Sequence, residues 1–480
     1  MKEYFIENED MILLNTIEYI ERKKDNRVTF EELIANIYTK RDKYNQLLFR
    51  FFDEIQYTEL ADCMSLKFED KSIVFERLEG YSYNRIYSFF IKRSIMFQFI
   101  NSIFLGTFKS LDIFLSEHNL TLRQFYYRKE KLDECLRKYK LRLNLRSGKK
   151  IIGEESQIRY FFFVLYWSLL QEDMTINPKF KSQKIMEYVL SKEEDRDYSV
   201  ILKEKLILEI VAKRIQQGYY IADNETFEIE ETPTISKKSM EEHFGKLYLE
   251  VFCLDKQYQK EMDSLYFFYC CMKTYSIEES NQTLWGVHFI SHSSCKFTIE
   301  WVNEVQNFFP FTLSLSEVMF LVINVYYLHQ AVVQFPGDFY TDSQQLLMNE
   351  VKIHYPQEEK NFQIFIQQLK KNSQVDFSSL LSDNFFINAQ YFSFIQQILH
   401  RHQIKLKVFV LSQASVVQRE QLKAWIKKYS PVKVEFVSDF EEEVDAVLAD
   451  FYCNNWCRNE EVPFLCTSFC MDVLQIQRIS

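Results

Sequence analysis

Glycine and proline are scarce in this chain, with 8 and 7 among 480 residues. Because these residue types interrupt helices, their scarcity predicts a mainly α protein in which strands are confined to small elements. The sequence also lacks any G-x-G-x-x-G or G-x-x-x-x-G-K-[ST] motif. Those motifs build the glycine loops that hold phosphates in nucleotide-binding enzymes, so their absence argues against that class, and no cofactor is expected.

A targeting signal and a long apolar run are lacking as well. The first ten residues are acidic, and ten cysteines are scattered along the chain, so we expect reduced thiols in a cytoplasmic protein. The most apolar stretch, residues 313–335, is interrupted by Glu317, Asn324, His329 and Gln330. A membrane span would not tolerate these four without partners, so we expect a buried helix and no membrane association.

Positive charge is in short supply overall but is concentrated in one place. The chain has 58 Lys and Arg against 68 Asp and Glu, a net charge of −10. Residues 121–150 hold 11 basic and 3 acidic residues, a net charge of +8. Because an acidic surface repels nucleic acid, we expect any nucleic-acid binding only in the N-terminal third.

The basic stretch lies in a segment that reads as a winged helix-turn-helix. Residues 111–118 predict a short amphipathic helix, and Asn119-Leu120 predicts a tight turn. Thr121 and Gln124 form a T-x-x-Q capping box that opens a longer helix. A basic hairpin is predicted after it, with strands at 141–145 and 149–152 and a turn at 146–148.

This arrangement predicts contact with double-stranded DNA, in which the longer helix enters the major groove and the wing holds phosphates. One side of that helix is apolar, and the other is expected to face bases or groove edges with Gln124, Tyr127, Arg128 and Lys131. Phosphate contacts are expected near the helix start at Thr121 and from Arg123, Arg142, Arg146, Lys149 and Lys150. The alternative is an ordinary solvated helix, but cap, turn, helix and wing occur in the order that DNA binding requires.

Residues 9–85 read as a second, weaker copy of the motif. A capping box at Thr29 and Glu32 opens one helix, and residues 38–55 predict another that carries Lys40, Arg41, Lys43 and Arg50. Residues 65–76 predict a hairpin with its turn at Asp70-Lys71. Because this wing is not basic, the copy either touches DNA or only positions the protein and mediates assembly.

The remaining chain predicts two helical blocks and a small α/β domain. An aromatic helix at 157–167 is expected in the core, and a second block is expected from 291 to 399. Beyond it, short apolar strands at 406–411, 432–437 and 445–449 flank a helix at 416–429. This alternation predicts a parallel sheet.

The sequence resembles the Mga/AtxA family of virulence regulators from Gram-positive bacteria. The resemblance is carried by residues 116–136 and by the junction Ile151-Ile-Gly-Glu-Glu-Ser-Gln-Ile-Arg-Tyr160. It implies a DNA-binding transcription activator that forms homodimers or higher oligomers, with phosphotransfer proteins of the sugar phosphotransferase system (PTS) as possible further partners. It also implies five domains: winged helix-turn-helix domains at 1–88 and 89–168, PTS regulation domains at 169–290 and 291–400, and an EIIB-like domain at 401–480.

Two departures from that pattern concern phosphorylation. PTS regulation domains are controlled at histidines, yet no histidine lies between His118 and His243. Asn324 stands where a similar helix of antiterminator relatives ends in histidine. His243 and His329 are the candidate phosphoryl acceptors, followed by His288, His292 and His354, but for each of them a surface or hydrogen-bonded core histidine is the better interpretation.

The C-terminal domain lacks the chemistry of a phosphocarrier enzyme. A working EIIB component carries a nucleophilic Cys or His after its first strand, where this chain has Ser412-Gln-Ala-Ser415. We therefore expect no enzyme activity. The spacing of Cys453, Cys457, Cys466 and Cys470 would admit zinc, but their apolar neighbours favour core packing, so no metal is expected.

Two other functions fit the sequence less well than DNA binding does. An RNA-binding antiterminator would need a small β-rich N-terminal domain, which two helical motifs contradict. A non-catalytic interaction protein would leave the charge of residues 121–150 unexplained. The sequence therefore favours a DNA-binding transcription regulator.

Overall fold

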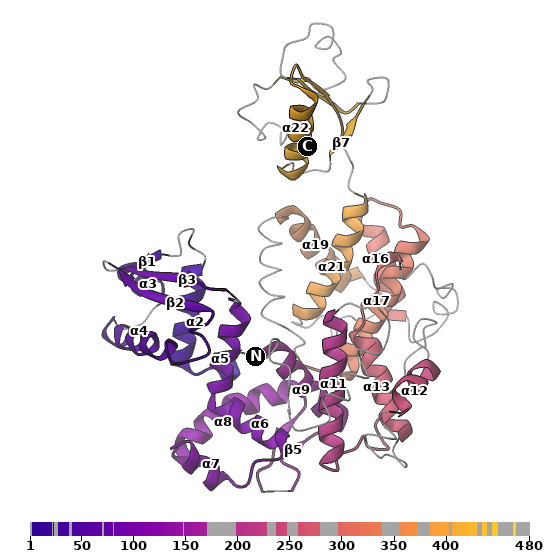
Figure 1. The fold of residues 1–480 in the computed structure, drawn as a ribbon. Coiled ribbons are helices and arrows are strands. Elements are labelled where there is room, and N and C mark those ends of the chain that lie inside the picture. Colours follow the sequence, from indigo (N-terminus) through magenta and orange to yellow (C-terminus); the bar gives the residue numbers. More distant parts are fainter. Residues whose placement is uncertain are drawn as a thin grey trace. The chain divides into compact units, whose positions relative to one another are not determined.

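The computed structural model describes most of the chain, with gaps. It covers residues 2–21, 23, 27–37, 41–69, 72–79, 81–146, 148–169, 198–227, 237–246, 258–278, 296–337, 355–372, 385–402, 406–429, 434–438, 444–449 and 464–466. The protein is mainly helical, as predicted, and divides into two compact units, residues 1–391 and 392–480 (Figure 1).

The N-terminal unit begins with a winged helix, here the first winged helix (residues 8–77). Its helices are α2 (Asn8–Glu21), α3 (Phe30–Ile37) and α4 (Arg41–Ile55), and the short helix α1 (Lys2–Phe5) precedes them. Its strands β1 (Arg27–Thr29), β2 (Met64–Glu69) and β3 (Ser72–Arg77) form an antiparallel sheet in the order β1-β3-β2. Strands β2 and β3 pair up to Glu69 and Ser72, and the predicted turn residues Asp70 and Lys71 lie outside the described residues.

The predicted capping box of α3 is only half present. Glu32 donates its backbone N–H to Thr29 Oγ1 at 3.2 Å, which is the cap. The Glu32 carboxylate instead accepts from Lys23 Nζ at 2.5 Å and from the Tyr19 hydroxyl at 3.3 Å. The Glu32 carboxylate is therefore bonded to the charged Lys23 amine and not to the Thr29 N–H, its partner in a complete capping box.

The second winged helix (residues 95–152) follows. It consists of helices α6 (Ile95–Leu105), α7 (Leu111–Glu117) and α8 (Leu122–Lys138) and strands β4 (Arg142–Leu143) and β5 (Ile151–Ile152). Helix α5 (Tyr83–Arg93) joins the two winged helices, and α9 (Glu155–Leu169) comes after the second. The predicted aromatic helix is α9, and its side chains Phe161, Phe162 and Phe163 are fully buried.

Helices dominate the rest of the N-terminal unit. They are α11 (Tyr198–Gln216), α12 (Lys237–Lys246), α13 (Tyr258–Met272), α16 (Lys296–Phe308), α17 (Leu315–Gln334) and α19 (Pro356–Asn372). Helix α17 matches the apolar stretch of the sequence and opens with a capping box between Ser314 and Glu317. Of the described helices, it alone has the length and apolarity to cross a membrane, but 72% of that window is buried inside the structure, as in a core helix.

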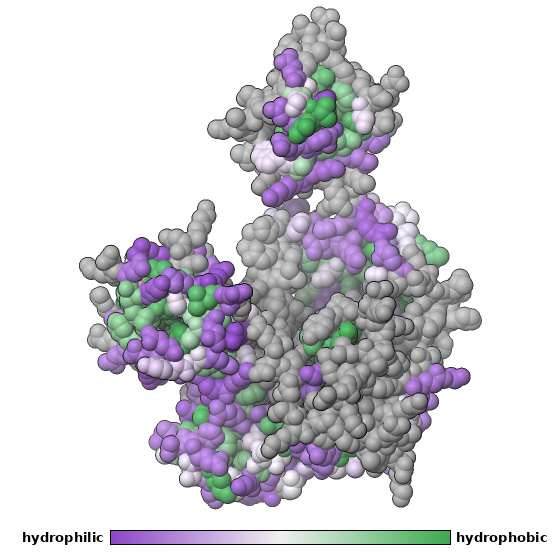
Figure 2. Space-filling view, in the orientation of Figure 1, coloured by the Kyte–Doolittle hydropathy of each residue, from purple (hydrophilic) through white to green (hydrophobic). Residues whose placement is uncertain are grey.

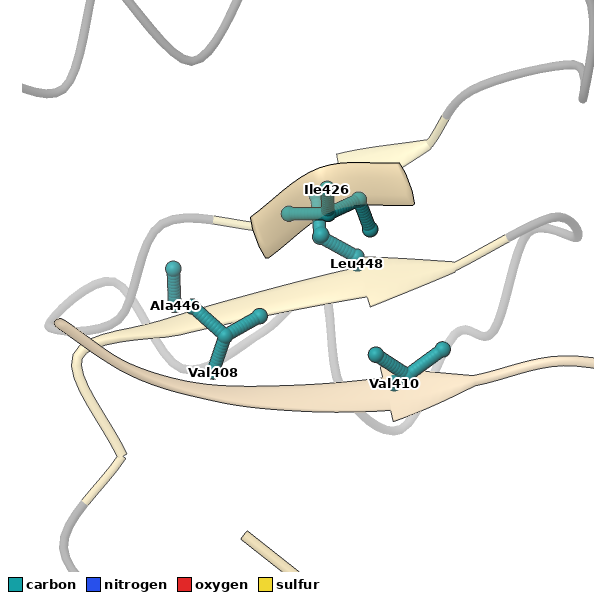
Figure 3. Close-up of a cluster of buried hydrophobic side chains, with 5 residues drawn as sticks. All are labelled: Val408, Val410, Ile426, Ala446 and Leu448. Carbon is teal, nitrogen blue, oxygen red and sulfur yellow. The ribbon is translucent and has the colours of Figure 1, made fainter. Parts of the chain in front are cut away.

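The C-terminal unit has the predicted parallel sheet, and α21 (Phe385–His402) leads into it. Strands β6 (Leu406–Leu411), β7 (Val434–Val437), β8 (Ala446–Ala449) and β9 (Phe464–Cys466) align in the order β7-β6-β8-β9. Helix α22 (Val416–Tyr429) packs Ile426 against Val408, Val410, Ala446 and Leu448 (Figure 3). The strand β9 was not predicted, and Cys453, Cys457 and Cys470 lie outside the described residues.

The loop after β6 uses its hydroxyl groups locally. Ser412 Oγ accepts from the Ala414 N–H at 3.0 Å. Ser415 caps α22, because its Oγ accepts from the Gln418 N–H at 3.4 Å and donates to Gln418 Oε1 at 3.0 Å. Both serines therefore shape the turn between β6 and α22.

Candidate nucleic-acid interface

Three aromatic rings hold the helices of the second winged helix together. Phe99 of α6, Phe114 of α7 and Phe125 of α8 meet with centroid separations of 5.0 to 6.2 Å and mainly edge-to-face geometry. Phe99 and Phe125 are fully buried, and Phe114 is 6% exposed. Such pairs fix ring orientation as well as burying apolar area, so they set the angle between α7 and α8.

Asn119 sets the turn between α7 and α8. It adopts the left-handed conformation with φ of 51°. The N–H of Leu120 donates to the Leu115 carbonyl at 2.9 Å, and that of Asn119 donates to Ser116 at 3.3 Å. This is a Schellman motif, in which asparagine tolerates the conformation that glycine usually supplies.

The capping box that the sequence predicted at α8 is complete. Thr121 Oγ1 accepts from the Gln124 N–H at 3.2 Å, and Gln124 Oε1 accepts from the Thr121 N–H at 2.9 Å. The hydroxyl of Thr121 also donates to Gln124 Oε1 at 3.0 Å. Both predicted contact residues are exposed, but the Thr121 hydroxyl and Gln124 Oε1 are used in starting the helix.

The exposed side of α8 matches the predicted side only in part, because Gln124 and Tyr127 are exposed whereas Arg128 and Lys131 are half-buried. Arg123, Tyr126, Tyr127 and Glu130 are exposed, with Tyr127 64% and Tyr126 49% accessible. Tyr126 was missed by the sequence analysis, because an aromatic residue beside Phe125 reads as core. Hydrophilic side chains cover most of the visible face over α7 and α8, with apolar ones scattered among them (Figure 2).

The N-terminal segment covers the other predicted side of α8. Arg128 Nε donates to Glu7 Oε1 at 2.8 Å, and Arg128 is half-buried. Lys131 Nζ donates to Asn8 Oδ1 at 3.4 Å. These two predicted base contacts are therefore engaged with the residues that join α1 to α2.

The wing is shorter than predicted. The pairs Arg142–Ile152 and Leu143–Ile151 define the two strands, and Asn144 donates its N–H to the Lys150 carbonyl at 2.8 Å. Asn144 Oδ1 also accepts from the Arg146 N–H at 3.1 Å, which shapes the turn. Arg142 and Arg146 are exposed, whereas Lys149 and Lys150 are half-buried.

A glycine allows the end of the wing to approach the end of α8. Gly153 has φ of 155°, and a Cβ atom there would clash with Leu141 Cδ2. The positive φ and this close approach both favour glycine, which explains its place in the Ile-Ile-Gly-Glu-Glu junction. The wing is thereby held close to the first turn of α9.

A buried ionic cluster connects α9 to two later helices. Arg214 of α11 makes two hydrogen bonds of 2.7 Å to the Glu155 carboxylate. Arg159 of α9 lies 2.5 Å from Glu261 of α13 and 3.3 Å from Glu155. Burial raises the pKa of Glu155, but the hydrogen bond and charge of Arg214 and the charges of Arg159 and Lys149 outweigh it and hold that pKa below its usual value.

The predicted phosphoryl acceptors have different settings. His329 is 4% exposed, with Nδ1 3.1 Å from Thr298 Oγ1 and Nε2 2.5 Å from the Tyr391 hydroxyl. Burial lowers the pKa of His329 to about 3, so the imidazole is neutral at physiological pH. This is the setting of a core histidine, the alternative that the sequence favoured. His243 lies in α12, but its side chain is not among those described, and His288, His292 and His354 lie outside the described residues.

Asn324, at the place of the missing histidine, has a structural role. It is 3% exposed, and its Oδ1 accepts from the Tyr275 N–H at 2.8 Å. Its Nδ2 donates to the carbonyls of Tyr275 at 3.1 Å and Phe320 at 2.8 Å. The amide therefore fastens α17 to the segment that follows α13.

In the first winged helix, the described cations of the sheet have acidic partners. Lys67 of β2 lies 2.6 Å from Glu76 of β3, and Arg27 lies 3.2 Å from Glu69. On α4, Arg50 lies 3.2 Å from Glu9. The side chains of Arg41 and Lys43 are not described, and Lys40 lies outside the described residues.

The family comparison matches the region just described. Residues 79–166 match the model of the Mga helix-turn-helix domain, a span that runs from before α5 through most of α9. It includes all of α5, which the predicted domain boundary at residue 89 divides. A comparison with curated proteins found no match. The chain thus contains a Mga helix-turn-helix domain, which supports the resemblance to the Mga/AtxA family and a DNA-binding regulator of the Mga type.

Proposed function

We propose that the protein contacts duplex DNA mainly through the second winged helix. Arg123, Tyr126 and Tyr127 on the exposed side of α8 would lie in the major groove. Arg142 and Arg146 of the wing would contact phosphates on either side. The exposure of these five residues in the most basic stretch of the chain is the observation that supports the proposal.

The other predicted contact residues would support this surface indirectly. Thr121 and Gln124 start the helix, and Arg128 and Lys131 hold it against the N-terminal segment. Lys149 and Lys150 are half-buried at the base of the wing. Because few exposed side chains suit direct base reading, DNA shape would contribute to site choice.

The proposal extends to assembly and control. One winged helix rarely provides enough contact area for specific binding, so we infer a homodimer or higher oligomer acting as an activator in the cytoplasm. We retain residues 169–290 and 291–400 as PTS regulation domains and residues 401–480 as an EIIB-like domain. With His329 buried and amide chemistry at Asn324, control through oligomerisation is favoured over phosphoryl transfer.

Duplex binding across a salt series tests the main contact. In the full-length protein, Arg142→Ala/Arg146→Ala should weaken binding at least tenfold and reduce the slope of log K against log salt by about 2, because two phosphate contacts are lost. The matched control, Arg27→Ala/Arg77→Ala, removes two arginines from the sheet of the first winged helix. A larger loss in the control would assign the main contact to the first winged helix.

A further inference from the structure

The segment that follows α17 lies against the end of α8. Gly337 has φ of 119°, and a Cβ atom there would clash with Cγ, Cδ1 and Cε1 of the Tyr139 ring. Tyr139 is the C-terminal cap of α8 and is 1% exposed. Both the positive φ and the close ring favour glycine at this position, so the backbone after α17 can lie directly on the Tyr139 ring.

Two neighbouring residues fasten the same segment to α9. The Pro336 carbonyl accepts a hydrogen bond of 2.7 Å from Nε2 of Gln157, which is buried. The Phe335 ring stacks on that of Tyr160 with a centroid separation of 4.7 Å and an interplanar angle of 15°. Phe335 is also in edge-to-face contact with two rings of α13. Residues 335–337 are therefore held between α9, α13 and the end of α8.

Tyr139 stands where α8 passes into the wing. Lys140 follows in the left-handed conformation, with φ of 53°. The N–H of Leu141 donates to the Leu136 carbonyl at 2.8 Å, so α8 ends in a Schellman motif. Strand β4 begins directly after it, at Arg142. A displacement of the Tyr139 ring would therefore move both the last turn of α8 and an arginine that we propose contacts phosphate.

We propose that Phe335, Pro336 and Gly337 are positioning residues for DNA binding. Resting on the proposed function, they act through Tyr139 to hold the end of α8 and the start of the wing in the orientation that presents Arg142 to a phosphate. Helix α17, from the second predicted helical block, thereby supports the DNA-binding surface without touching DNA. A rearrangement at this end of α17 would change the affinity for DNA.

Duplex binding by full-length variants tests the positioning role. Gly337→Ala should weaken binding by about fivefold, because the added methyl group displaces the Tyr139 ring. Gly218→Ala is the matched control. Gly218 also has a positive φ, of 79°, but a Cβ atom there meets no atom within 4 Å, so binding should change by less than about twofold. Equal losses in the two variants would assign the effect to backbone strain and overturn the proposal.

A second substitution separates positioning from a general loss of stability. Tyr139→Ala removes the three ring atoms that the new methyl group would meet. The double variant Tyr139→Ala/Gly337→Ala should therefore bind DNA about threefold more tightly than the two single losses predict when combined. A merely structural role of Gly337 would give independent losses, and that result would contradict the proposal.

Hydrogen exchange without DNA tests the contact separately from the DNA-binding proposal. In Gly337→Ala, exchange should become faster over residues 136–143, at the end of α8 and the start of the wing, and stay unchanged over residues 8–77. If the wild type binds no duplex, the proposed function fails, and this measurement still decides whether α17 supports α8. Unchanged exchange over residues 136–143 would overturn the inference.

Discussion

The hairpin of the first winged helix pairs six residues of β2 with six of β3, whereas β4 and β5 of the second pair only two residues each. The exposure of positive charge follows the opposite trend and is greater in the shorter wing. In the longer sheet Lys67 and Arg27 have carboxylate partners, and in the shorter wing Arg142 and Arg146 are exposed. The two winged helices thus place their cations differently: ion pairs across a sheet favour cohesion, whereas exposed arginines favour an external anion.

The largest expected difference between the two winged helices concerns the stability of their aromatic cores. Phe125 is fully buried among three helices, so Phe125→Ala should destabilise the second winged helix by about 3–5 kcal/mol. Phe68 is only half-buried against three other rings, those of Phe30, Phe49 and Phe52. Phe68→Ala should therefore destabilise the first winged helix by less. Hydrogen exchange of the full-length variants, read separately over residues 8–77 and 95–152, measures both. A greater loss for Phe68→Ala would reverse the ranking of the cores.

A smaller effect is expected when two arginines of α8 are compared for DNA binding. Arg123→Ala should weaken duplex binding by about tenfold, in keeping with the roughly 1–3 kcal/mol of a base contact. Arg128→Ala should change it less than threefold, because Arg128 is paired with Glu7. Fluorescence anisotropy at fixed salt is the measurement. If Arg128→Ala has the larger effect, the N-terminal segment must move away from α8 when DNA binds.

The smallest expected effect concerns the two helix caps. Thr121→Ala should destabilise the second winged helix by about 1 kcal/mol, because the complete box of α8 is lost. Thr29→Ala should cost less, since Glu32 keeps its bond to Lys23 when the cap is removed. Hydrogen exchange at the first turns of α8 and α3 measures the loss of stability in each variant. Equal losses would mean that the second half of a capping box adds nothing here.

Local patterns in the sequence predicted the elements well. The capping box at Thr121 and the spacing of Phe125, Leu132 and Leu136 placed α8 and most of its buried side correctly. Leu122, which the same spacing assigned to the buried side, is 51% exposed, so that part of the prediction was wrong. The alternation after residue 405 predicted the parallel sheet, because helix and strand periods are read within a few residues.

Contacts between distant segments could not be predicted in this way. Arg128 and Lys131 belong to the polar side of α8, and the approach of Glu7 and Asn8, more than 120 positions earlier, pairs them and leaves them half-buried. The short strand β1 pairs with β3 more than 40 positions later, and its three residues carry too little periodicity to be recognised alone. The contact between Lys149 and the ring of Tyr219 was missed for the same reason, since Tyr219 follows the distant helix α11.

Asn324 has a consequence for how the protein can be controlled. Its amide meets both the N–H and the carbonyl of Tyr275, so it imitates a peptide group of a neighbouring strand. A histidine there could change its protonation state, and its ring nitrogen could accept a phosphoryl group from another protein. An amide has neither, so the hydrogen bonds that join α17 to the segment after α13 do not depend on phosphoryl transfer to this position.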